Sequence, residues 1–152
     1  TCAVGTGGTL AGVSRYLKAQ SEAVQIVLAD PMGSALHHWV TQGEPSMSPG
    51  PSITEGIGNS RITENLSDTV VDASYQVTDQ EMVDMCYRLL REDGWFFGSS
   101  SGINLGAAVK IAQSLGSGHT IVTILCDGGG KYQSRLYNAD FLEARDLYVP
   151  SP

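Results

Sequence analysis

The chain has 152 residues and carries 9 Lys and Arg against 16 Asp and Glu, a formal net charge of −7 with a pI near 4.7. This acidity argues against nucleic acid or an anionic membrane as partner, because either surface is bound through clustered positive charge. The 41% hydrophobic content exceeds that of disordered chains, and no apolar run reaches the roughly 18 residues that span a membrane. We therefore expect one globular domain with small-molecule or protein partners.

The glycine and cysteine content narrows the class of protein further. Glycine occurs 18 times, which predicts several tight turns around ligands. The cysteines Cys2, Cys86 and Cys126 are odd in number and lack the spacing of metal ligands. We expect a reducing compartment such as the cytoplasm, without disulfides and without a metal site. The residues after Thr1 already look like a strand, which predicts that a further N-terminal portion precedes the chain.

The first elements follow the order strand, turn, helix, strand. Residues 1–4 are β-prone, residues 5–9 form a glycine-rich turn, and residues 10–19 place apolar side chains at helical spacing. The apolar run 24–29 is typical of a strand buried on both faces of a parallel sheet. Residues 43–65 then form a long loop rich in Gly, Pro and Ser. Loops of this length are usually functional covers or disordered linkers.

The second half of the chain continues the alternation. The expected elements are β-prone stretches at 70–71 and 75–77, a helix from the capping box Thr78–Glu81 to Gly94, a strand at 95–97, a turn at 98–102, a helix at 103–115 ended by Gly116, a strand at 120–126, a turn at 127–130 and an amphipathic stretch at 134–147. This pattern predicts an α/β fold with a parallel sheet covered by helices on both faces. Ligands bind at the carboxyl ends of such strands, where we expect the turns 5–9, 98–102 and 127–130 to converge.

The turn Gly5–Thr9 predicts a phosphate cradle. Its backbone N–H groups lie at the positive end of a helix dipole, and two threonine hydroxyls add donors. The alternatives are a turn without ligand and a dinucleotide-binding turn, for which Asp30 would be the ribose-binding acid. Leu10 occupies the third glycine position of the dinucleotide pattern. The residues therefore suit a terminal phosphate monoester better than a buried pyrophosphate.

Three serines precede the predicted helix at 103–115. We interpret Ser101 as the N-cap of that helix. For Ser100 we favour a ligand role, in which its hydroxyl meets a heterocyclic nitrogen.

Four motifs in order resemble one enzyme family. AVGTGGTLAG, EGIG, GSSSGIN and CDGGGKYQSRLY are together similar to the cysteine synthase and cystathionine β-synthase family, which uses pyridoxal 5'-phosphate (PLP). The resemblance covers almost the whole chain and implies the tryptophan synthase β type of fold, called fold-type II. Residues 1–152 would then be the phosphate-binding large domain, with an active-site loop at 43–65, lacking most of the smaller N-terminal domain.

The resemblance also implies a role for each motif. The PLP phosphate would be held by Gly5, Thr6, Gly7, Gly8 and Thr9. Ser100 would face the pyridine nitrogen, Gly56 would lie on the amino-acid side of the cofactor, and Asp127 with the following loop would close the pyridine end. The glycines after Asp127 indicate a flexible or substituted wall there.

The implied reaction is β-replacement, in which a leaving group departs from Cβ and a sulfur nucleophile adds. A neutral hydroxyl at Ser100 makes the cofactor a weaker electron sink than an aspartate would, which favours β-elimination over transamination. The resemblance favours cysteine synthase, which joins O-acetylserine and sulfide. Glu55 precedes GIG, where cysteine synthases commonly carry glutamine, and so favours the alternative of cystathionine β-synthase acting on serine and homocysteine.

One required residue, the lysine that holds PLP as a Schiff base, is not assigned in this chain. In the family it precedes the phosphate loop, whereas Lys18 and Lys110 fall in helices and Lys131 stands where the family has another basic residue. We assign no catalytic residue and expect the chain alone to be inactive. A non-catalytic binding module is the alternative from another class. The family implies an amino-acid substrate, the missing N-terminal portion and a second subunit of a homodimer as partners, and in some members serine acetyltransferase.

Overall fold

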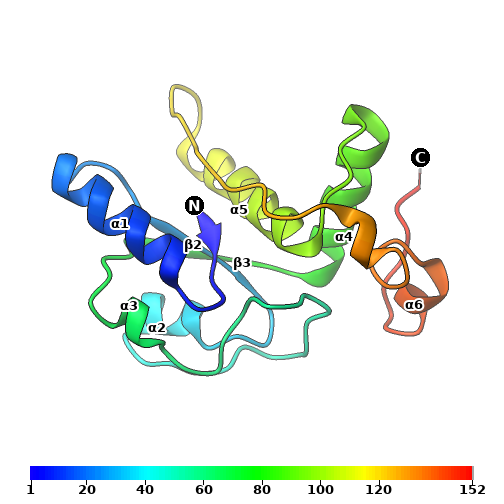
Figure 1. Cartoon of the computed structure of the whole chain (residues 1–152), viewed down its shortest axis with the longest axis horizontal. Coiled ribbons are helices and arrows are strands. Elements are labelled where there is room, and N and C mark those ends of the chain that lie inside the picture. The colour runs from blue at the N-terminus through cyan, green and yellow to red at the C-terminus, as the bar shows by residue number, and fades with distance from the viewer. Residues whose placement is uncertain (152) are drawn as a thin grey trace.

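The computed structural model describes residues 1–151 and contains a three-stranded parallel sheet flanked by helices (Figure 1). The strands lie in the order β1 (Cys2–Ala3), β2 (Val27–Pro31) and β3 (Ala73–Val77). The register pairs Ala3 with Ala29 and Ala29 with Tyr75. The predicted α/β fold with a parallel sheet is confirmed.

The helical segments begin and end at the residues that local chemistry favours. They are α1 (Gly8–Gln20), α2 (Leu36–Gln42), α3 (Glu64–Ser67), α4 (Asp79–Arg88) with a π-helical turn (Leu89–Asp93), α5 (Ser99–Leu115), a 3-10 turn (Gly129–Tyr132) and α6 (Ala139–Glu143). The predicted capping box is present, since Thr78 N–H donates to Glu81 Oε2 at 2.7 Å and Glu81 N–H donates to Thr78 Oγ1. The expected stops at Gly94 and Gly116 are confirmed by φ values of 72° and 79°.

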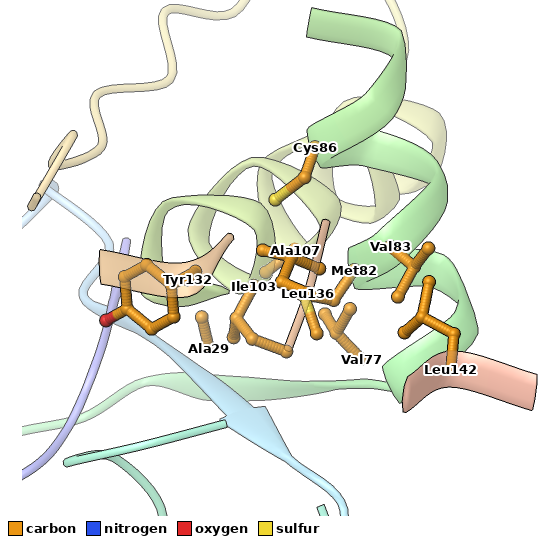
Figure 2. Close-up of a cluster of buried hydrophobic side chains, with 10 residues drawn as sticks. All are labelled: Ala29, Val77, Met82, Val83, Cys86, Ile103, Ala107, Tyr132, Leu136 and Leu142. Carbon is orange, nitrogen blue, oxygen red and sulfur yellow. The ribbon is translucent and has the colours of Figure 1, made fainter. Parts of the chain in front are cut away.

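Helices pack on both faces of the sheet because its strands bury alternate residues on opposite sides. Leu28 faces a cluster beneath α1 and α2, formed by Cys2, Val4, Leu10, Ile26, Leu28, Leu36 and Leu66. Ala29 faces the other cluster, formed by Ala29, Val77, Met82, Val83, Cys86, Ile103, Ala107, Tyr132, Leu136 and Leu142. Figure 2 shows side chains from α4, α5 and the C-terminal segment meeting in this second cluster.

Helix α5 runs antiparallel to the strands, as a crossover helix does. Its first turns lie beside the end of β1, where Asn104 Oδ1 accepts from Ala3 N–H at 2.6 Å. Its last turns, around Ile111 and Leu115, line an apolar groove with Val27 and Ala73, the first residues of β2 and β3. The N-termini of α1 and α5 therefore share the carboxyl edge of the sheet, and Figure 1 shows both helices running away from it in the same direction.

Two expected strands are absent from the described residues. Residues 95–97 form only one antiparallel bridge, between Phe97 and Gly128. This segment joins a π-helical turn to α5 and faces the turn after Asp127, where no strand is available to extend a ladder.

The expected strand at 120–126 is also wrong. This extended segment is hydrogen-bonded to Thr1: the Thr1 amine donates to Val122 O at 2.7 Å, and Thr123 Oγ1 donates to Thr1 O at 2.8 Å. Val122 is 70% exposed. Within residues 1–151, no helix combines the length and apolarity needed to cross a membrane.

Candidate functional site

The predicted phosphate cradle lies at the start of α1. Gly7 precedes the helix with φ of 88°, a left-handed conformation that glycine adopts without strain. No side chain caps this end and no acidic residue occupies its first turn. The N–H groups of the first turn have no intrahelical partner, and Thr6, Gly8 and Thr9 are exposed beside them. The turn thus presents backbone donors to solvent at the positive end of a 13-residue helix.

The predicted loop motif at Gly56 packs directly against this cradle. A Cβ on Gly5 would lie 2.3 Å from Gly56 O, so the two backbones approach as only glycine allows. Gly58 N–H donates to Val4 O at 2.9 Å, which fixes the loop at the end of β1. The structure therefore brings Gly5 and Gly56 together.

Three polar side chains of the same loop bind the carbonyl groups of the cradle. Asn59 Nδ2 donates to Gly5 O, Thr63 Oγ1 donates to Thr6 O at 2.9 Å, and Asn65 Nδ2 donates to Thr6 O at 3.0 Å. Sequence reasoning missed all three residues. The available signal was their position, since each follows the EGIG motif within ten residues and has a short polar side chain.

The loop 43–65 is held along much of its length. Ser34 O accepts from Ser48 N–H at 2.9 Å, and Ser34 Oγ accepts from Asn59 N–H at 3.1 Å. Asp79 at the start of α4 accepts from Ile53 N–H at 2.7 Å. Glu55 forms an ion pair with Arg135. The loop is thus a bridge between the β2–α2 turn, α4 and the cradle, and not the disordered linker that its composition allows.

The serines of the third motif form the first turn of α5. Gly98 is the N-cap residue, so the expected N-cap role of Ser101 is wrong. Ser101 Oγ accepts from Cys126 N–H at 2.9 Å and so is used to hold the extended segment. Ser100 is 8% exposed, and the neighbouring Ser99 Oγ is buried without a hydrogen-bond partner. A buried polar atom without a partner is rare and marks a place where a ligand group can bind.

Asp127 lies next to this turn and is tightly held. Gly98 N–H donates to Asp127 O at 2.8 Å, and Tyr132 OH donates to Asp127 Oδ2 at 3.0 Å. Burial alone would raise the pKa of Asp127, but the Lys131 and Tyr132 hydrogen bonds and the Lys131 charge hold it below its usual value. Its Oδ1 is buried without a partner. A Cβ on Gly98 would collide with both Asp127 and Tyr132, so the start of α5 packs closely against Asp127.

Asp30 does not offer a ribose-binding carboxylate. It is fully buried inside β2, and its Oδ2 accepts from His37 N–H at 2.8 Å. Burial raises the pKa of Asp30 to about 6, against the opposing effects of Ser34, His37 and His38. Together with Leu10 in the third glycine position, this burial argues against the dinucleotide alternative.

All three lysines of the chain pair with carboxylates. Lys18 contacts Asp72 at 2.8 Å, Lys110 contacts Glu81 at 2.8 Å, and Lys131 contacts Asp127 at 2.5 Å. Lys18 and Lys110 lie on helices, as expected. Among residues 1–151, no three His, Cys, Asp or Glu side chains come close enough to hold a metal ion.

The comparisons with known proteins agree with the motifs. The family described as "Pyridoxal-phosphate dependent enzyme" matches residues 1–127. The chain belongs to this family. Its members depend on pyridoxal phosphate, and the match includes the cradle, the loop at Gly56 and the α5 turn.

Two fungal relatives are named for a specific reaction. Cysteine synthase 1 of Neurospora crassa is 48% identical over 100% of this chain and 42% of its own length. Cysteine synthase 1 of Emericella nidulans is 46% identical over 97% of this chain and 41% of its own length. The chain thus spans about two fifths of the length of these cysteine synthases.

A solved structure has the same fold as this chain. The crystal structure of the O-acetylserine dependent cystathionine beta-synthase from Helicobacter pylori superposes with a TM-score of 0.76 at 34% identity. The match covers 88% of this chain and 41% of that chain. The fold is therefore that of a fold-type II PLP enzyme, of which this chain is a part.

Proposed function

We propose that this chain is the cofactor-phosphate-binding part of a PLP-dependent β-replacement enzyme of the cysteine synthase type, which forms cysteine from O-acetylserine and sulfide. The observation that carries the proposal is the uncapped glycine cradle at Gly5–Thr9, packed against Gly56 at the carboxyl edge of the sheet. The names of the fungal relatives support the choice of reaction.

The residues of the cradle suit the phosphate group of PLP. Residues 6–9 have their backbone N–H groups at the start of α1, and the exposed Thr6 and Thr9 carry hydroxyl donors beside them. A phosphate monoester at this place would gain hydrogen bonds and a favourable interaction with the helix dipole. When bound, PLP supplies the electron sink that makes the α-proton of an amino acid acidic and lets a β-substituent depart.

The remaining site residues have roles around the ring. Ser100 provides a neutral hydroxyl at the buried start of α5. Unlike an aspartate, this hydroxyl would not keep the pyridine nitrogen protonated. Asp127, held by Tyr132, would close that end of the site. Gly56 would leave space on the amino-acid side, because it carries no side chain next to the cradle. The buried Ser99 Oγ without a partner supports ligand binding at this turn.

The catalytic base would come from outside this chain. Each lysine here is paired with a carboxylate, and in the family the Schiff-base lysine precedes the phosphate loop. We therefore place it in the remaining portion of the enzyme, and the chain alone would be inactive. The further proposed partners are a second enzyme subunit in a homodimer and serine acetyltransferase, and the proposed compartment is the cytoplasm.

Cystathionine β-synthase chemistry on serine and homocysteine is the second candidate. Glu55 before the GIG motif favours it. The structural neighbour from Helicobacter pylori is named a cystathionine beta-synthase, but one that depends on O-acetylserine. In this chain Glu55 forms an ion pair with Arg135, so its carboxylate is already engaged at the edge of the loop.

The test of the proposed function is intact-mass spectrometry of the purified enzyme after borohydride reduction, which fixes PLP to its lysine. We expect the PLP adduct on a polypeptide other than, or longer than, the 16.1 kDa chain. A single unmodified species of 16.1 kDa would favour the non-catalytic binding module instead.

Product analysis separates the two reactions. The enzyme is incubated with O-acetylserine and sulfide, and in a parallel assay with serine and homocysteine. Faster cysteine formation in the first assay supports the proposal, and faster cystathionine formation in the second supports the alternative.

A further inference from the structure

We propose that Asn59 is a positioning residue that turns the Thr6 N–H toward the phosphate by holding the Gly5 carbonyl. The inference deepens the proposed function, on which it rests, and concerns a residue that does not itself touch the cofactor. Its basis is the hydrogen bond from Asn59 Nδ2 to Gly5 O.

The side chain of Asn59 acts on the phosphate site through the peptide group between Gly5 and Thr6, which carries both the Gly5 carbonyl and the Thr6 N–H. In a trans peptide the C=O and the following N–H point in opposite directions. The bond from Asn59 fixes Gly5 O on the side of the long loop. The N–H of Thr6, in the same plane, therefore points away from the loop. Because Gly5 O can only accept a hydrogen bond, the side chain at residue 59 must present a donor.

Asn59 is itself held from several directions. Its N–H donates to Ser34 Oγ at 3.1 Å, and its carbonyl accepts from Ala35 N–H at 2.7 Å and from Ser34 Oγ at 3.2 Å. Ser34 is fully buried. The amide of Asn59 is thus a fixed donor anchored to the β2–α2 turn, and the rotation of the Gly5–Thr6 peptide is restricted before any ligand binds.

The next peptide plane is held in the same way by two donors. Thr63 Oγ1 and Asn65 Nδ2 both donate to Thr6 O, which directs the Gly7 N–H away from them. Thr63 is the N-cap residue of α3, yet its side chain does not cap that helix. Its hydroxyl donates to Thr6 O of the cradle and does not cap α3. Thr6 O accepts from two side chains, whereas Gly5 O accepts from the side chain of Asn59. We therefore expect the loss of Asn59 to weaken PLP binding more than the loss of Thr63 or Asn65 alone.

The test uses the complete enzyme, prepared without cofactor and titrated with PLP. We expect Asn59→Ala to raise the dissociation constant of PLP on the order of tenfold, the effect of losing one hydrogen bond that supports a charged group. The phosphorus NMR signal of bound PLP should shift, because one phosphate donor changes direction. Thr63→Val and Asn65→Ala should each have a smaller effect than Asn59→Ala, and the double variant a comparable one.

Asn138→Ala is the matched control. Asn138 caps α6 by accepting from Phe141 N–H at 2.9 Å, so its loss lowers thermal stability without touching the cradle. We expect an unchanged PLP dissociation constant and phosphorus signal in this variant. Wild-type values of the PLP dissociation constant and phosphorus signal in Asn59→Ala would overturn the inference and leave the proposed function standing, whatever the Thr63→Val/Asn65→Ala double variant shows. A wild-type enzyme that binds no PLP would overturn the proposed function as well.

Discussion

At the scale of single residues, the candidate site combines a neutral hydroxyl, a held carboxylate and a row of backbone donors. Ser100 is the residue that decides the reaction type under the proposed function, because it is neutral where a carboxylate would keep the pyridine nitrogen protonated. Its position in the first turn of α5 is set by Gly98, which caps that helix without a side chain.

Replacing Ser100 tests this role directly. We expect Ser100→Asp to suppress β-replacement in the complete enzyme at least tenfold, because a protonated pyridine favours competing reactions at Cα. Initial rates of cysteine formation measure the effect, with PLP content determined in the same samples. Unchanged turnover with full PLP content would contradict the role of Ser100.

Asp30 provides a prediction on stability and pH. Its folded pKa of about 6 lies above the ordinary value near 4, so the folded state binds its proton more tightly than the unfolded state does. The contribution of Asp30 to stability is therefore largest below pH 4 and is lost as the pH rises from about 4 to about 6. Asp30→Asn lacks this titration. Between about pH 4 and pH 6 we therefore expect the free energy of unfolding of the wild type to fall by about 3 kcal/mol relative to that of Asp30→Asn. Thermal unfolding at half-unit pH steps measures the slopes. Parallel curves would show that Asp30 titrates normally.

At the scale of elements, the loop 43–65 and the turn 5–9 form one packed unit. Gly5 tolerates no Cβ because Gly56 O lies where that atom would be, whereas a Cβ on Gly12 in α1 meets nothing within 4 Å. Gly5 lies in the turn before α1 and Gly12 lies inside the helix, seven residues further on. They form a natural pair for testing the packing of the loop.

We expect opposite results from the same substitution at these positions. Gly5→Ala should lower the free energy of unfolding by about 1–3 kcal/mol through overpacking. Gly12→Ala should raise it by up to about 1 kcal/mol, because alanine is the better helix former. Urea unfolding followed by circular dichroism compares both variants with wild type. Equal effects would show that the contact at Gly56 yields without cost.

Some elements of the fold could be predicted from the sequence and others could not. The parallel sheet, the capping box at Thr78 and the helix stops at Gly94 and Gly116 depend on local chemistry and were predicted. The strand expected at 120–126 is absent from the described residues, because an apolar run indicates burial and β-propensity but does not say which backbone pairs with it. The motifs singled out Gly5 and Gly56 but not their contact with each other. The donor role of Asn59 depends on the direction of one carbonyl, which no sequence pattern encodes.

At the scale of the whole molecule, one buried amide joins the sheet to the extended segment. Asn104 is fully buried in α5; its Oδ1 accepts from Ala3 N–H and its Nδ2 donates to Ile124 O at 2.7 Å. It therefore satisfies backbone groups on two segments that lack a regular ladder between them.

Removing this amide should destabilise the molecule as a whole. We expect Asn104→Ala to lower the free energy of unfolding by about 2–4 kcal/mol, since two backbone groups lose their partners. Faster hydrogen exchange at Ala3 N–H, followed by mass spectrometry, should accompany the loss. A change below about 0.5 kcal/mol would mean that water replaces the amide at both ends.

The bonds that hold the loop 43–65 also determine where a protease can cut it. Residues 43–47 are exposed and precede the first bond of the loop to Ser34; they are held to α2 by the bonds of Gly43 N–H to Trp39 O and of His38 Nδ1 with Ser46 O. Residues 56–59 are tied to Val4, Gly5 and Ser34. Cleavage requires a backbone that can enter the protease in an extended form, so limited digestion should nick residues 43–47 first. Because every donor to the cradle lies on the C-terminal side of that nick, the cut chain should keep its phosphate-binding geometry.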